Sequence, residues 1–218
     1  MELAGYIDHT LLQPDTRGEE IRKLCEEALA YHFAAVCVPP FYVKDAVNLL
    51  DETPVKISTV VGFPLGYSTT SAKVEEIKRA LDEGCNEVDV VVNIAAVKNG
   101  SWNYVHNDIA SMTTAVHLKG KMVKIILETG LMSPEEIDRL CEICLEVEPD
   151  FVKTSTGFNG KGATLAVVRH LHEMLADSPI RIKASGGIRS LKDAQAMIEA
   201  GAMRIGSSSG VKIMEELA

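Results

Sequence analysis

The sequence predicts an α/β fold, built as a single (β/α)8 TIM barrel over residues 1–218. Eight short, mostly apolar stretches are each followed by a stretch with the apolar spacing of a helix. Strands that alternate with helices pair in parallel, and eight such units close a barrel. No linker or break in composition divides the chain. The alternative is a doubly wound open sheet, but no G-x-G-x-x-G motif follows the first long strand.

Four strands and the helices between them are expected in the first half of the chain. Residues 34–38 are continuously apolar and stop at a pair of prolines, as a strand buried on both faces should. Val74, Ile77 and Leu81 mark the apolar face of a helix, and Gly84 follows it as a C′ residue. The expected strands cover 6–10, 34–38, 56–62 and 87–93. The expected helices follow Pro14, cover 41–50, end at Gly84, and lie between 94 and 120 after an irregular piece.

The second half continues the same alternation. Ser133, Pro134 and Glu136 predict a helix start, with serine as N-cap, proline at N1 and glutamate at N3. Ser190 and Asp193 predict another, which ends at Gly201. The expected strands cover 122–128, 151–157, 181–187 and 204–208. The expected helices start at Ser133, cover 163–176, start at Ser190, and cover 210–217.

Composition narrows the function classes. The chain has 218 residues, of which 46% are hydrophobic, enough for one large domain with a sizeable core. Its net charge of −9 argues against a nucleic-acid or anionic-membrane surface. The five cysteines are odd in number and scattered, so we expect a reducing, cytoplasmic compartment and no disulfide framework. We also expect no signal peptide and no membrane-spanning segment.

Two predicted strands each carry a lysine in an otherwise apolar stretch, Lys153 and Lys183. Lysine is almost never fully buried unless it is paired, so the two lysines form either one functional site or structural ion pairs. Neighbouring strands lie about 4.8 Å apart, so two inward lysines at matching depth repel each other and one pKa must fall. A lysine that is neutral near pH 7 is a nucleophile toward carbonyls, as Schiff-base catalysis requires.

Asp89 supplies a carboxylate for these lysines. It stands mid-strand among valines, in Val88-Asp-Val-Val-Val. A carboxylate there can act as a counter-ion, as a proton carrier, or as both. The predicted catalytic residues are therefore Lys153, Lys183 and Asp89.

Small-residue loops follow the last two predicted strands. Barrels commonly bind phosphate at these positions, through backbone N–H groups, hydroxyls and a short helix N-terminus. Such local donors can bind a small anion in spite of the negative net charge. The candidate residues are Ser185, Gly186, Gly187, Gly206, Ser207 and Ser208.

Other polar and sulfur-containing side chains are weaker candidates. Cys141 and Cys144 lie on the apolar face of a predicted helix without a second ligand pair, so we expect core packing and no metal site. Glu128 ends a predicted strand and either lines the barrel mouth or pairs with a strand-end lysine. Cys37 is expected to fill the core, although a strand-end position could bring it near the mouth.

Four motifs contain these candidate residues. They are Glu-Val-Asp-Val-Val-Val-Asn around Asp89, Val-Lys-Thr-Ser-Thr-Gly-Phe around Lys153, Lys-Ala-Ser-Gly-Gly-Ile-Arg from Lys183, and Arg-Ile-Gly-Ser-Ser-Ser-Gly from Arg204. The opening Ile-Asp-His-Thr-Leu-Leu and the loop Val-Gly-Phe-Pro-Leu-Gly add to them. From about residue 6 to 215, the sequence resembles the deoxyribose-phosphate aldolase family.

The resemblance implies a cofactor-free class I aldolase. Such an enzyme interconverts 2-deoxy-D-ribose 5-phosphate with acetaldehyde and D-glyceraldehyde 3-phosphate, in deoxyribose phosphate catabolism. Lys153 would form the Schiff base, Lys183 would favour the neutral form of that amine, and Asp89 would move protons through water. The residues implied to hold the phosphate are Gly157, Gly186, Gly187, Ser207 and Ser208. Some family members end in a tyrosine that assists proton transfer; this sequence ends in Glu-Glu-Leu-Ala, so the resemblance does not supply that proton route.

The expected partners are a small sugar phosphate and a short aldehyde, and we expect a homo-oligomer. Two other function classes stay open. One is another phosphate-binding barrel enzyme, such as a sugar-phosphate isomerase or a different Schiff-base aldolase. The other is a non-catalytic sugar-phosphate sensor. A sensor needs only the phosphate loops, so the two lysines and the aspartate favour an enzyme.

Overall fold

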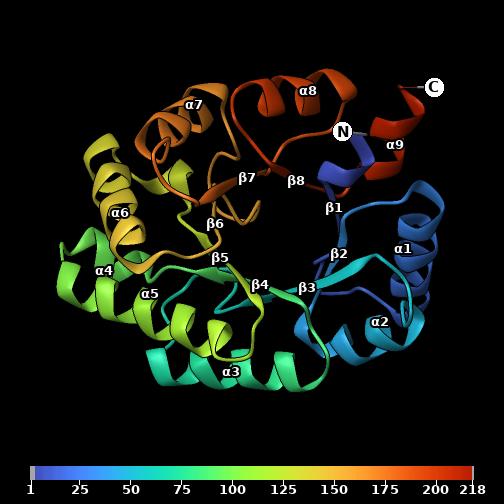
Figure 1. Cartoon of the computed structure of the whole chain (residues 1–218), viewed down its shortest axis with the longest axis horizontal. Helices are drawn as coiled ribbons and strands as arrows, with labels where there is room; N and C mark the ends of the chain where they lie inside the picture. Colours follow the sequence, from blue (N-terminus) through green and yellow to red (C-terminus); the bar gives the residue numbers. More distant parts are fainter. Residues whose placement is uncertain (1–2, 218) are drawn as a thin grey trace.

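The computed structural model describes residues 3–217 and shows eight parallel strands in one closed barrel, in chain order (Figure 1). The predicted fold class is confirmed. The assignment of residues 1–218 to one domain stays a prediction, and Met1, Glu2 and Ala218 lie outside the described residues. The strands are β1 (Ile7–Thr10), β2 (Ala35–Val38), β3 (Lys56–Val61), β4 (Glu87–Val91), β5 (Met122–Ile126), β6 (Phe151–Lys153), β7 (Arg181–Ser185) and β8 (Arg204–Ser207).

Helices surround the barrel, as Figure 1 shows. The α-helices are α1 (Gly18–Tyr31), α2 (Val43–Leu49), α3 (Thr70–Asp82), α4 (Ile94–Lys98), α5 (Trp102–His117), α6 (Pro134–Val147), α7 (Leu165–Met174), α8 (Leu191–Glu199) and α9 (Gly210–Glu215). Short 3-10 helices are η1 (Leu3–Tyr6), η2 (Pro40–Tyr42) and η3 (Thr129–Leu131). The capping box predicted at Ser133 and Glu136 is present at the start of α6.

Six strands, β3 to β8, end one to four residues earlier than the sequence suggests, and β6 differs most. For β6 and β7 the loop after the strand is the cause. β6 stops at Lys153 because the Thr156 amide donates to the carboxylate of Glu128 and not to a strand carbonyl. β7 stops at Ser185 because Gly186 and Gly187 have φ angles of 88° and 82°. These left-handed conformations leave the extended region that a strand requires.

Two helices also differ from expectation. The piece expected to be irregular contains α4, which Asn93 caps by accepting a hydrogen bond from the Ala96 amide. On α3, Lys73 is fully buried whereas Val74 is half-buried. The Lys73 ammonium donates to Asp108 on α5 at 2.8 Å and to the carbonyl oxygen of Val91 at 2.9 Å. A partner on another helix therefore overrides the apolar periodicity of α3.

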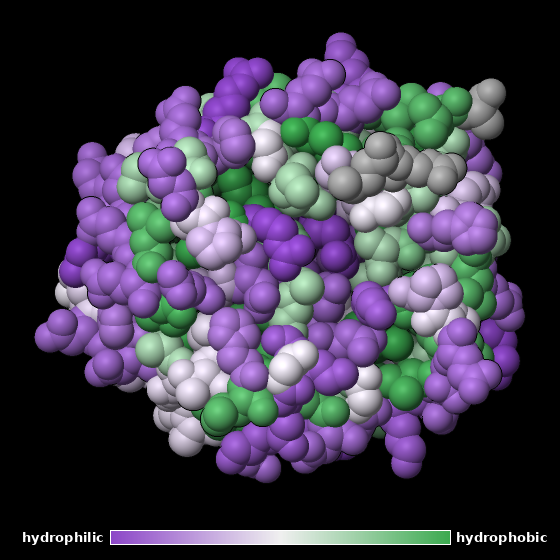
Figure 2. Space-filling view, in the orientation of Figure 1, coloured by the Kyte–Doolittle hydropathy of each residue, from purple (hydrophilic) through white to green (hydrophobic). Residues whose placement is uncertain are grey.

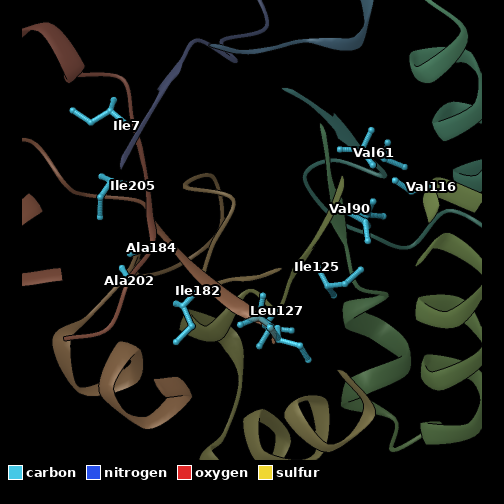
Figure 3. Packing of buried hydrophobic residues seen from close by; sticks show 14 of the residues in the cluster. Ile7, Val61, Val90, Val116, Ile125, Leu127, Ile182, Ala184, Ala202 and Ile205 are labelled. Carbon is cyan, nitrogen blue, oxygen red and sulfur yellow. The ribbon is translucent and has the colours of Figure 1, made fainter. Parts of the chain in front are cut away.

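The apolar core lies between the barrel and its helices. Alternate strand residues, among them Ile7, Val90 and Ile125, point away from the barrel axis and pack with helix residues such as Val116 (Figure 3). All five cysteines are free and buried, which confirms core packing for Cys141 and Cys144. Among residues 3–217, no helix is long and apolar enough to cross a membrane.

The inside of the barrel has the opposite character. On β4, Asp89 lies between the outward-pointing residues Val88 and Val90, so its side chain points into the barrel. Lys124 on β5 is the register partner of Asp89 and also points inward. Both side chains are fully buried. Figure 2 shows strongly hydrophilic residues over the middle of one face, where the strands converge in Figure 1. The barrel thus encloses charged groups within an apolar shell.

Candidate active site

Five charged side chains from five strands meet inside the barrel. They are Asp8 on β1, Asp89 on β4, Lys124 on β5, Lys153 on β6 and Lys183 on β7, and none is more than 3% exposed. Lys153 and Lys183 are register partners on neighbouring strands, which confirms the predicted matching depth. Since buried charges are costly unless paired, the contacts among these five groups determine what the site can do.

Asp89 is the shared acceptor of this cluster. Its Oδ2 accepts hydrogen bonds from the ammonium groups of Lys153 at 2.8 Å and Lys183 at 2.7 Å. Its Oδ1 accepts from Lys124 at 2.8 Å and from the Ser58 hydroxyl at 3.2 Å. Burial alone would raise the pKa of Asp89, but the three lysines outweigh it and hold that pKa well below its ordinary value. Asp89 is therefore a carboxylate at neutral pH.

The two lysines of β6 and β7 have different surroundings. Lys183 also forms an ion pair with Asp8, so its ammonium lies between two carboxylates. Burial by itself lowers the pKa of Lys183, but Asp8 and Asp89 outweigh burial and raise it. Lys153 pairs with Asp89 and reaches a cavity. This asymmetry makes Lys183 the fixed cation and leaves Lys153 as the amine that can meet a ligand.

The cavity at Lys153 has a volume of about 220 Å³ and opens where the carboxyl ends of β1, β6, β7 and β8 converge. Asp89 and Lys183 are fully buried and are not among its lining residues. Every residue that the sequence nominates for phosphate binding lines it: Gly157, Ser185, Gly186, Gly187, Gly206, Ser207 and Ser208. The structure thus places one amine and the small-residue loops around a single space.

Close packing accounts for two of these glycines. A Cβ on Gly186 would lie 2.8 Å from the Cα of Gly162, and its φ is 88°. A Cβ on Gly206 would lie 2.9 Å from the Cβ of Ser185 and 3.1 Å from the Cε of Lys183. Gly206 therefore leaves room for the stem of the buried lysine.

Two of the predicted serine hydroxyls are bonded within the loops. The Ser185 hydroxyl donates to the carbonyl oxygen of Ser155 at 2.6 Å. The Ser207 hydroxyl donates to the carbonyl oxygen of Ile188 at 2.7 Å and accepts from the Ser209 amide at 3.0 Å. These hydroxyls shape the loops, so donation to an anion there falls mainly to backbone N–H groups.

A family model for DeoC/LacD family aldolases matches residues 3–216. The chain belongs to this family. A deoxyribose-phosphate aldolase from Caldanaerobacter subterraneus subsp. tengcongensis is 50% identical over 99% of this chain and 94% of the relative. One from Thermococcus gammatolerans is 48% identical over 99% of this chain and 96% of the relative. The solved tetrameric deoxyribose phosphate aldolase from Aeropyrum pernix has a TM-score of 0.93, with 34% identity over 99% of this chain and 90% of that chain.

The sequence did not indicate two of these five charged groups in this aldolase, Asp8 and Lys124, or their partners Glu87 and Arg204. Lys124 donates to Glu87 at 2.6 Å as well as to Asp89. Arg204 donates to Asp8 at 2.7 Å and to Glu87 at 3.0 Å. Burial raises the pKa of Asp8, but Arg204, Lys183 and Lys124 outweigh burial and lower it to about 2. One sequence signal could have identified Glu87. It stands two residues before Asp89 on the same strand, and side chains two residues apart in a strand point to the same face.

Two weaker candidates have defined places in this aldolase. Glu128 is fully buried, and its carboxylate accepts hydrogen bonds from Thr156 and Asn159. Both interpretations suggested by the sequence, mouth lining and a lysine partner, are therefore wrong. Cys37 is fully buried in β2, which confirms the core-filling interpretation. Burial, followed by the charge of Asp89, raises the pKa of the Cys37 thiol.

Proposed function

We propose that this chain reversibly cleaves 2-deoxy-D-ribose 5-phosphate to acetaldehyde and D-glyceraldehyde 3-phosphate, with Lys153 as the Schiff-base residue. The observation that carries the proposal is the single cavity that joins the Lys153 amine to the loops after β6, β7 and β8. An amine and small-residue loops that can bind an anion, both lining one cavity, suit a phosphorylated aldehyde. The names of the two relatives described above support the choice of sugar.

The reaction begins when the neutral amine of Lys153 adds to the aldehyde carbon C1 and water leaves, which gives a protonated imine. A proton then leaves the C3 hydroxyl, and the C2–C3 bond breaks. The bonding electron pair moves into the imine and forms an enamine, while D-glyceraldehyde 3-phosphate departs. A proton adds to C2, and water then releases acetaldehyde and restores the amine.

Asp89 and Lys183 act on the amine of Lys153 from inside the barrel, on the side away from the cavity. Lys183 stays positively charged between two carboxylates, and its repulsion favours the neutral form of its neighbour. The Oδ2 atom of Asp89 touches the nitrogen atoms of both lysines, at 2.8 Å and 2.7 Å. A proton can therefore move between Lys153 and Lys183 through one oxygen, and water can extend this route to the substrate.

The phosphate would lie against the loops that contain Gly157, Gly186, Gly187, Ser207 and Ser208. Their backbone N–H groups can converge on an anion because glycine allows the left-handed turns found at Gly157, Gly186 and Gly187. Ser208 is exposed beside them and offers a further hydroxyl.

Reduction with borohydride tests the proposal directly. Incubation with acetaldehyde and borohydride should leave one ethyl group on the chain, and peptide mapping should locate it at Lys153. Cleavage of 2-deoxy-D-ribose 5-phosphate is measured in parallel by the release of D-glyceraldehyde 3-phosphate. A label on another lysine, or no cleavage by a protein that carries the label on Lys153, would contradict the residue assignment or the substrate assignment respectively.

We further propose that the chain forms a homo-oligomer in the cytoplasm. The Aeropyrum pernix relative is tetrameric, and it covers almost the whole of this chain. Five free, buried cysteines fit a reducing compartment. Light scattering coupled to gel filtration should give a mass of at least twice the mass of one chain.

A further inference from the structure

One fully buried carboxylate takes no part in the proposed chemistry, yet it holds the loop that forms a wall of the substrate cavity. Glu128, just after β5, accepts a hydrogen bond from the Thr156 amide at 3.1 Å and another from the Thr156 hydroxyl. It also accepts from the side-chain amide of Asn159 at 3.1 Å. A buried carboxylate is tolerated when donors satisfy its oxygens, and here all three donors come from one loop.

The same loop faces the cavity on its other side. Thr156, Gly157 and Phe158 line the cavity together with Lys153. The Phe158 amide donates to the Thr156 hydroxyl oxygen at 3.1 Å. Both carboxylate oxygens of Glu128 accept hydrogen bonds, so the Thr156 hydroxyl donates its hydrogen to Glu128 and leaves its oxygen to receive Phe158. The position of Phe158 thus depends on the acceptor atoms of Glu128.

The loop after β6 is also tied to the loop after β3, although these strands are not neighbours in the barrel. Asn159 donates to the carbonyl oxygen of Pro64 at 2.8 Å. The rings of Phe63 and Phe158 meet edge to face, with centroids 5.1 Å apart. Asn159 therefore links the buried carboxylate to a second loop across the barrel mouth.

The backbone conformation of Glu128 is also unusual for a residue other than glycine. Its φ and ψ are 54° and 51°, a left-handed conformation that glycine adopts readily and that other residues adopt at a cost. A non-glycine residue persists in this conformation where its surroundings over-determine it. At Glu128 those surroundings include the hydrogen bonds that its carboxylate accepts from Thr156 and Asn159.

We propose that Glu128 is a positioning residue for the phosphorylated substrate: through Thr156 and Asn159 it sets the wall formed by residues 156–158. This inference rests on the proposed function for the identity of the substrate. The hydrogen bonds of Glu128 in the described part of the chain reach the loop and not the catalytic lysines. Glu128 therefore governs how the sugar phosphate binds and leaves Schiff-base formation on Lys153 unchanged.

Glu128→Gln tests the proposal, because it places an amide donor against groups that are themselves donors. The loop then loses hydrogen bonds that hold it in the position that binds substrate. We therefore expect the KM for 2-deoxy-D-ribose 5-phosphate to rise about tenfold to a hundredfold. We expect kcat to fall by less than about threefold, and borohydride trapping of acetaldehyde on Lys153 to keep its rate and pH profile. The matched control is Glu146→Gln on α6, whose side chain is 59% exposed and pairs with His106 at the surface.

Hydrogen–deuterium exchange gives a readout that needs no substrate. The amides of residues 155–160 should exchange faster in Glu128→Gln than in the unsubstituted protein and in Glu146→Gln. If the unsubstituted protein does not cleave the sugar but the exchange rate still rises in Glu128→Gln, the proposed function fails, whereas the role of Glu128 in holding the loop stands. A folded Glu128→Gln variant with unchanged exchange and unchanged KM overturns the proposal. A shifted trapping pH profile also overturns it, because Glu128 would then act on the lysines.

A second variant covers the case in which Glu128→Gln does not fold. Asn159 is half-exposed, so Asn159→Ala removes the bridge to Pro64 and leaves Thr156 to satisfy the carboxylate. We expect a KM increase of about threefold and faster exchange in the same peptide, since the two hydrogen bonds of the Asn159 side-chain amide, to Pro64 and to Glu128, are lost. No change in either quantity in this variant contradicts the proposal.

Discussion

Lys153 and Lys183 occupy equivalent places in two similar motifs, and at the scale of single residues their neighbours make them different. Lys183 touches two carboxylates, Asp8 and Asp89, and is 0% exposed. Lys153 touches one of these carboxylates and the cavity. The two carboxylates beside Lys183 favour its positive charge, whereas Lys153 has one such partner and an open side toward the cavity.

The first prediction separates the roles of the two lysines. Lys153→Arg should abolish borohydride trapping with acetaldehyde, because guanidinium stays protonated and forms no imine. Lys183→Leu should still allow trapping at high pH, but the half-maximal pH of trapping should move upward because the neighbouring cation is gone. Mass spectrometry over a pH series measures both effects. A label on Lys183, or an unmoved profile in Lys183→Leu, would reverse the assignment.

The second prediction concerns Asp89. Asp89→Asn should lower kcat by about a hundredfold or more, the usual scale for a lost proton carrier. It should also lower the free energy of unfolding by about 3–5 kcal/mol, because three lysines lose their shared buried partner. Steady-state kinetics and urea unfolding followed by circular dichroism measure the two quantities. A stable variant with near-normal kcat would limit Asp89 to the role of a counter-ion.

At the scale of elements, six of the eight strands (β1, β4, β5, β6, β7 and β8) supply the charged side chains of the interior. Glu87 and Asp89 project from β4 at a spacing of two, and Lys124 on β5 meets both. The loops after β6, β7 and β8 line the cavity. Strands thus set the depth and order of the charged groups, whereas loops decide what can enter.

The third prediction tests the loop after β8. Ser208→Asp places a carboxylate where the phosphate dianion is proposed to bind, so KM for 2-deoxy-D-ribose 5-phosphate should rise by about tenfold or more through like-charge repulsion. Activity on unphosphorylated deoxyribose should change much less. Parallel kinetics on the two sugars measure the difference. Equal losses on both would show that the loop is structural.

At the scale of the whole molecule, the protein has two buried regions of different character. The space between strands and helices is apolar, and the space inside the strands holds paired charges, including Arg204 and Asp8 from the two ends of the described chain. Removing one partner from such a cluster leaves an unpaired buried charge, which is strongly destabilising. The stability of the molecule should therefore depend on pH at both ends of the scale.

The fourth prediction gives that dependence. The pKa of Asp8 falls on folding from 3.8 to about 2, which corresponds to about 2 kcal/mol of stability at neutral pH. This contribution is present above pH 4 and is lost as pH falls toward 2, and Asp89 adds to the loss in the same direction. The pKa of Lys183 is raised from 10.5, so its contribution is lost above that pH. Urea unfolding between pH 2 and 11 measures both limbs; a flat acid limb would contradict the pairing.

The sequence by itself determined the fold class, the approximate positions of the eight strands and the meeting of Lys153, Lys183 and Asp89 inside the barrel. These follow from local patterns, because apolar runs, helix caps and charged residues in strands depend on near neighbours in the chain. The strand ends were less well predicted, that of β6 least of all, since the loop after β6 makes hydrogen bonds to a distant residue.

The tertiary structure alone decided which charges meet. Asp8 and Arg204 are 196 residues apart and pair because β1 lies beside β8 when the barrel closes. Lys73 is buried because α5 brings Asp108 to it, and Glu128 is satisfied by a loop 28 residues away. Partner choice for a buried charge depends on strand order and barrel closure, and local periodicity carries no information about either.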